Sequence, residues 1–167
     1  MGYLKVSLIV FSFLAISRFI PHPPNFTSLQ TLSFYLPAVF GIKFIPIVLF
    51  SLIITDTIIG IHSVILFTWG SVICIGIISK YFNRSILFRF FGVMTGVVIF
   101  FILSNFGVWL NGAYGYNFRG FVECYMLALP FFGYSLISTI FFSFIIELAY
   151  KLFRTRFLNL MIKINRL

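Results

Sequence analysis

The sequence predicts an all-α integral membrane protein, a six-transmembrane-helix bundle with a short extra helix, re-entrant or interfacial, before the last span. Composition is the first reason: of 167 residues, 61% are hydrophobic and 9% charged, with a mean hydropathy of +1.12. Soluble domains are about 45–50% apolar and about 25% charged. The excess of apolar surface must therefore face lipid. The second reason is a series of apolar segments that are separated by short connections, so we expect one polytopic membrane domain over residues 1–167.

The lengths of the apolar segments, and the Pro, Gly and Asn residues between them, define the expected elements. Periodicity is less informative here, because helices in lipid are apolar on every side. Pro21, Pro23 and Pro24 end the first span, since proline cannot continue helical hydrogen bonding. A cleavable signal peptide is a weaker interpretation of the same N-terminal stretch. Pro130 is expected to end a short segment, 121–129. The expected spans are 3–20, 29–42 (short for a span), 43–61, 63–82, 86–110 and 131–153.

The distribution of basic residues predicts the orientation. With the N-terminus in the cytoplasm and alternating spans, ten of the twelve Lys and Arg residues fall at cytoplasmic ends. The opposite topology would break the positive-inside rule. We therefore expect both termini in the cytoplasm, in a bacterial-type cytoplasmic (inner) membrane. The net charge of +9 has the same explanation, and no nucleic-acid motif accompanies it.

Two arginines do not follow this rule, and they fall where other polar residues gather. The outer ends of the expected spans hold both histidines and two of the three carboxylates, while the inner half is nearly all apolar. Polar groups inside a membrane are costly unless they pair or face water. Their concentration at one end predicts a polar cavity open to the outside. The candidate site residues are Arg18, His22, Asn25, Asp56, His62, Asn105, Trp109, Tyr116 and Arg119.

Several of these residues also have a purely structural interpretation. Asp56 either binds a ligand or proton, or it caps a helix or pairs with Arg18. It is six positions from His62, roughly 120° around a helix, so the two do not share a face. Trp109 fits an aromatic belt as well as a stacking role. A local salt bridge to Glu123 is the favoured interpretation of Arg119, four residues earlier.

Enzymatic signatures are missing from the sequence. It contains no GxSxG, HExxH, GxGxxG or P-loop pattern. Two histidines, two cysteines and three carboxylates without ligand spacing give no metal site. We therefore expect no catalytic residues, no metal and no cofactor, and any energy for transport must come from a gradient or a partner.

Four stretches carry a resemblance to a known family: "SRFIPHPPNFT" (17–27), "ITDTIIGIH" (54–62), "SNFGVWL" (104–110) and "ECYMLALPFF" (123–132). They resemble a family of uncharacterised transport proteins similar to the S-components of energy-coupling-factor (ECF) vitamin transporters. The resemblance implies six helices, cytoplasmic termini and a substrate pocket near the outer face. This chain departs from the family pattern at 133–135 and 138–139, where a charge of the last helix is missing.

The resulting functional expectation is uptake of a small vitamin- or cofactor-like solute. Arg18 would attract an anionic group, Asp56, His62 and Asn105 would hydrogen-bond the solute, and aromatic residues would stack on it. The resemblance implies an energising transmembrane/ATPase module as a partner. The first alternative is a solitary carrier of the cobalamin type. Two others are a structural or assembly subunit of a membrane complex, and an intramembrane lipid-modifying enzyme that uses Asp56 or His62.

Overall fold

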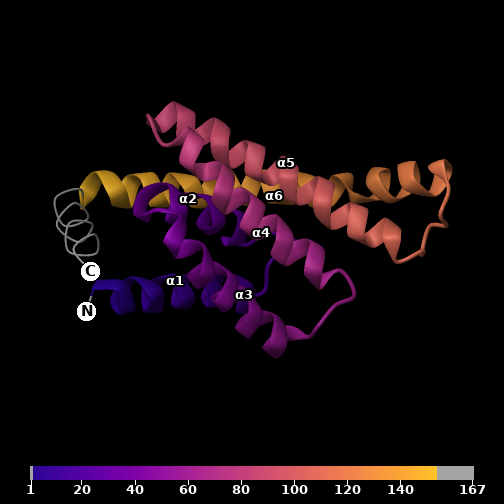
Figure 1. Cartoon of the computed structure of the whole chain (residues 1–167), viewed down its shortest axis with the longest axis horizontal. Helices are drawn as coiled ribbons and strands as arrows, with labels where there is room; N and C mark the ends of the chain where they lie inside the picture. The colour runs from indigo at the N-terminus through magenta and orange to yellow at the C-terminus, as the bar shows by residue number, and fades with distance from the viewer. Residues whose placement is uncertain (1, 154–167) are drawn as a thin grey trace.

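The computed structural model describes residues 2–153, and all regular structure in this range is helical. The elements are α1 (Gly2–Phe19), α2 (Leu29–Phe40), the 3-10 turn η1 (Ile42–Phe44), α3 (Ile45–Ile59), α4 (Ile65–Ser79), the 3-10 turn η2 (Lys80–Phe82), α5 (Ile86–Leu110) and α6 (Phe118–Leu152). Successive helices run up and down a bundle (Figure 1). The start of α1 and the end of α6 lie at the same end of the bundle.

The structure confirms the predicted all-helical class, but it does not show six membrane spans. Within residues 2–153, four segments are long and apolar enough to cross a membrane: Ile42–Ile59, Ile65–Phe82, Ile86–Leu110 and Phe118–Leu152. These indicate a multi-pass membrane protein. α2 has 12 residues and is therefore only about 18 Å long, against a hydrocarbon core of about 30 Å.

The prediction of a separate short helix at 121–129 is wrong. α6 runs without interruption through Pro130 for 35 residues. Proline removes one backbone hydrogen bond from a helix interior. Ending the helix in an apolar environment would leave several backbone groups unpaired, which costs more. The exposed position of Pro130 also lets its ring avoid neighbouring helices.

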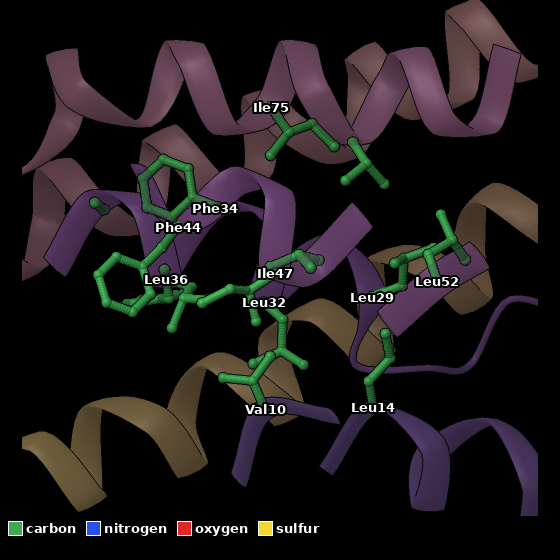
Figure 2. Close-up of a cluster of buried hydrophobic side chains, with 14 of the residues drawn as sticks. Val10, Leu14, Leu29, Leu32, Phe34, Leu36, Phe44, Ile47, Leu52 and Ile75 are labelled. Atoms are coloured by element: carbon green, nitrogen blue, oxygen red, sulfur yellow. The ribbon is translucent and has the colours of Figure 1, made fainter. Parts of the chain in front are cut away.

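α2 forms the centre of the bundle. All of its residues except Val39 are buried. Figure 2 shows its leucines and Phe34 among side chains from α1, α3 and α4. A helix of this length can be retained inside the protein because neighbouring helices cover most of its surface. Its polar residues, including Gln30, are buried as well and therefore need partners within the protein.

α5 and α6 form a hairpin that extends past the loops of the other helices (Figure 1). Their 25 and 35 residues correspond to about 38 and 52 Å of helix. The connection between them is short and contains two glycines with positive φ, Gly112 and Gly115. This overhang separates the tip of the hairpin from the ends of α1 and α3.

Candidate solute pocket

A pocket of about 260 Å³ lies where α1 and α3 end, away from the chain termini. It brings together five of the nine candidate residues from the sequence: Arg18, His22, Asn25, Asp56 and His62. Residues of α2, α4 and α5 complete its walls. The remaining lining residues are Thr27, Leu29, Gln30, Leu52, Ile59, Thr68 and Phe100.

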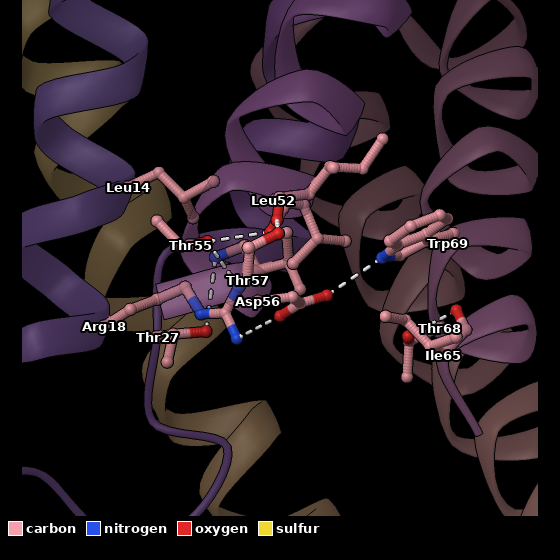
Figure 3. Close-up of polar contacts among 12 residues, drawn as sticks. Leu14, Arg18, Thr27, Leu52, Thr55, Asp56, Thr57, Ile65, Thr68 and Trp69 are labelled. Atoms are coloured by element: carbon pink, nitrogen blue, oxygen red, sulfur yellow. Dashed lines mark hydrogen bonds and ion pairs between the residues drawn. The ribbon is translucent and has the colours of Figure 1, made fainter. Parts of the chain in front are cut away.

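An ion pair between Arg18 and Asp56 forms one wall of the pocket (Figure 3). Arg18 Nη2 donates to Asp56 Oδ1 at 2.6 Å, and Arg18 Nη1 donates to Thr55 Oγ1 at 2.6 Å. The second carboxylate oxygen of Asp56 accepts a hydrogen bond from Trp69 Nε1 at 2.9 Å. The network therefore joins α1, α3 and α4 through one carboxylate.

This geometry matches the structural interpretation of Asp56. The side chain of Asp56 is 2% exposed and that of Arg18 15% exposed. A buried carboxylate is costly unless it is paired and hydrogen-bonded, and both oxygens of Asp56 have partners here. The pair cancels the charge of Arg18, which reduces the attraction for an anionic solute that the sequence suggested.

The segment between α1 and α2 folds over the pocket as an ordered series of turns. Asn25 has a φ of 62°, in the left-handed region that asparagine tolerates. The Phe26 amide donates to the Pro23 carbonyl, and the Thr27 amide donates to the Asn25 carbonyl. His22 Nδ1 donates to the Pro23 carbonyl at 2.7 Å. Hydrogen bonds between Ser17 and Ser28 fix the end of this segment to α1.

His62 reaches the pocket from the connection between α3 and α4. α3 ends at Ile59, and Gly60 follows with a φ of +131°, a conformation that side chains rarely allow. The chain therefore changes direction before His62. The helical spacing that separated His62 from Asp56 does not continue this far, and both residues line the pocket.

Gln30 is a pocket residue that the candidate set from the sequence missed. It is 2% exposed, its Nε2 donates to Ser135 Oγ at 3.3 Å, and its Oε1 accepts from Thr139 at 3.4 Å. Ser138 Oγ lies 3.4 Å from the Asn25 carbonyl, to which it donates. The signal was present in the sequence, because hydroxyl residues at 135, 138 and 139 share one face of α6.

The other four candidate residues lie on the α5–α6 hairpin and do not line this pocket. Asn105 Nδ2 donates to the Phe101 carbonyl of its own helix. Trp109 Nε1 donates to the Gly115 carbonyl, and Tyr116 Oη donates to the Leu110 carbonyl. Trp109 packs edge-on against Tyr116 and Phe121. These contacts stabilise the hairpin tip.

Arg119 is exposed at the start of α6. The local salt bridge expected between Arg119 and Glu123 is wrong, because the ion pairs of residues 2–153 are Arg18–Asp56 and Arg89–Glu147. Two exposed side chains gain little from pairing and lose rotamer freedom when they do.

The second ion pair was not expected from the sequence. Glu147 on α6 accepts two hydrogen bonds from Arg89 on α5, at 2.6 and 2.8 Å. The guanidinium of Arg89 also lies 5.7 Å from the ring centre of Tyr150. Arg89 is near the start of α5 and Glu147 near the end of α6. These two helix ends lie on the side of the bundle that holds the chain termini (Figure 1).

The fold and pocket define a helical membrane protein with a polar cavity near the ends of α1 and α3. The sequence matches a family described as "Family of unknown function (DUF6580)" over residues 3–161, and the chain belongs to this family. No curated protein and no solved structure matched it.

Proposed function

We propose that the chain is a membrane solute-binding protein that takes up a small vitamin- or cofactor-like solute through this pocket, in the manner of an ECF S-component. The observation that carries the proposal is the convergence of His22, Asn25, Gln30 and His62 on one cavity. These residues come from three separate parts of the chain. A pocket with apolar walls and a few convergent polar groups is the usual form of a small-molecule site.

The division of roles follows from the contacts. Arg18 and Asp56 already satisfy each other, so they hold the wall in place. Asn25 and His62 are exposed residues of the pocket lining, so their side chains are available to a solute. Leu52, Ile59 and Phe100 supply the apolar walls. This set suits a neutral or weakly charged polar solute better than a strongly anionic one.

The volume limits the size of the solute. At about 260 Å³, the pocket is slightly smaller than the roughly 300–1,000 Å³ of typical ligand sites. One heterocyclic ring with short polar substituents is the appropriate scale. The proline-containing segment 21–24 covers the site with restricted backbone freedom, which lowers the entropy lost on closure.

In this proposal the chain lies in a bacterial-type cytoplasmic membrane with both termini in the cytoplasm. Release of the solute on the inner side needs a source of energy. The proposed source is a transmembrane/ATPase module of the ECF type, to which the chain would attach.

Single substitutions in the polar rim of the pocket are expected to weaken solute binding without unfolding the protein. We expect His62→Ala and Asn25→Gly each to weaken binding about tenfold, which corresponds to one lost hydrogen bond. Glycine is chosen at 25 because it keeps the left-handed backbone. Binding is measured by thermal shift and calorimetry, with a panel of vitamins and their precursors and with any solute that co-purifies.

Arg119→Gln provides the matched control, since Arg119 is exposed outside the pocket and should leave binding unchanged. The proposal fails if no small molecule stabilises the protein, or if Arg119→Gln weakens binding as much as His62→Ala. Loss of a co-purifying protein in the His62→Ala variant would instead indicate an assembly subunit. Loss of lipid turnover would indicate an enzyme.

A further inference from the structure

A second cavity, unrelated to the solute pocket, lies in the half of the bundle that holds the chain termini. It is a groove of about 290 Å³ between α1, α2 and α6. Its walls are hydrocarbon apart from the two phenol groups of Tyr35 and Tyr150. Among the lining residues are Val6 and Val10 of α1, Val39 of α2, and Ile146 and Ala149 of α6.

The groove exists because α1 and α6 have different packing partners. α1 packs mainly against α3, and α6 packs mainly against α5. α2 is therefore the floor of a gap that these two helices flank (Figure 1). An apolar gap on the membrane-facing side of a bundle has to be filled, because an empty one forfeits dispersion contacts along its whole lining.

The length and lining of the groove suit a hydrocarbon chain. The stretch of α1 from Val6 to Phe13 that lines the groove rises about 10 Å. One acyl chain can lie along this stretch, in contact with side chains from α1, α2 and α6 that are almost wholly apolar.

Positive charge flanks the same groove. Lys5 precedes its first α1 residue, and Lys151 follows its last α6 residue. Both lysines are exposed, and neither forms an ion pair within residues 2–153. The nearby carboxylate of Glu147 does not neutralise them, because Arg89 binds both of its oxygens. Basic sites between transmembrane helices on the cytoplasmic side are typical of anionic lipid recognition.

We propose that this groove is a binding site for an anionic phospholipid, with one acyl chain between α1 and α6 and the phosphate between Lys5 and Lys151. The apolar walls supply affinity for the chain, and the two lysines supply the preference for a negative headgroup. The site is separate from the solute pocket, so lipid and solute bind independently.

Lipid binding is tested by native mass spectrometry of the full chain after delipidation, with equal amounts of phosphatidylglycerol and phosphatidylcholine added. Two lysines near a headgroup are expected to give a preference of roughly thirtyfold for the anionic lipid. The Lys5→Gln/Lys151→Gln variant should lower this preference to near one. Lys80→Gln is the matched control, because Lys80 is an exposed lysine outside the groove.

A second variant tests the acyl-chain site itself. Ala149→Phe fills the groove and should lower retention of both lipids several-fold, whereas Leu148→Phe, on the neighbouring exposed position, should not. Inorganic phosphate at millimolar concentration should fail to displace the lipid, because it lacks the chain. Equal retention of the two lipids by the unchanged protein, displacement by phosphate, or indifference to Ala149→Phe would each overturn the proposal. So would a co-purifying membrane protein that Ala149→Phe removes.

Discussion

Replacing Asp56 by alanine is expected to destabilise the bundle by about 3 kcal/mol, the lower end of the range for a buried pair, because the substitution leaves the partly buried guanidinium of Arg18 without its counter-charge. Trp69 Nε1 loses its acceptor as well. In a protein of this size the loss corresponds to a fall of roughly 10 °C in the midpoint of thermal unfolding. The midpoint is measured in detergent micelles, with the unchanged protein alongside.

The double variant Arg18→Met/Asp56→Leu distinguishes an unpaired charge from lost packing. Replacing both partners of a buried pair with apolar residues is often neutral or stabilising. We expect the double variant to recover most of the free energy of unfolding that Asp56→Ala loses. A deficit of about 1–3 kcal/mol should remain, because the Trp69 N–H stays unpaired. If Asp56→Ala unfolds at the same temperature as the unchanged protein, the ion pair does not hold α1 to α3.

Replacing Gly120 by alanine is expected to disrupt the tip of the α5–α6 hairpin. A Cβ at this position would lie 1.9 Å from the carbonyl oxygen of Tyr114 and 2.7 Å from that of Gly115. These are backbone atoms, so the connection has to move as a whole. The hydrogen bond that Trp109 Nε1 donates to the Gly115 carbonyl in this connection would be lost. The expected cost is about 1–3 kcal/mol or more, measured as a lower unfolding midpoint and a red-shifted tryptophan emission.

The same helix offers the control. A Cβ at Gly133 would meet nothing within 4 Å, and alanine is the better helix former. Gly133→Ala should therefore be neutral or slightly stabilising. A similar loss of stability in both variants would show that α6 tolerates no added methyl group, rather than that Gly120 packs against the connection.

The helices could be predicted well because turn residues interrupt the apolar segments. Pro21, Pro23 and Pro24 separate α1 from α2, and Asn83 precedes α5. The same rule failed at Pro130, where the cost of exposing backbone groups to an apolar environment exceeds the cost of the proline. The burial of α2 was not predictable from periodicity, because an apolar helix looks the same whether lipid or protein surrounds it.

The site was predicted in part for a related reason. Arg18 and Asp56 lie near the C-terminal ends of α1 and α3, which are at the same end of the bundle, so the two residues were correctly placed together. Asn105 and Trp109 also lie near a helix end, but α5 extends further than α3, and its end is at the hairpin tip. Counting residues along each segment cannot show how far one helix extends beyond another along the axis of the bundle. The partners of Asp56 on α4 and of Gln30 on α6 depend on which helices are neighbours, which the sequence does not state.

The short length of α2 has a consequence for the order in which the protein assembles. A segment of 12 residues that carries Gln30 cannot rest in lipid by itself, because its amide group would lack partners there. Those partners, Ser135 and Thr139, follow 105 and 109 positions later in the chain. The wall that Gln30 gives the cavity can therefore be completed only after the final helix has been synthesised and has packed against α2.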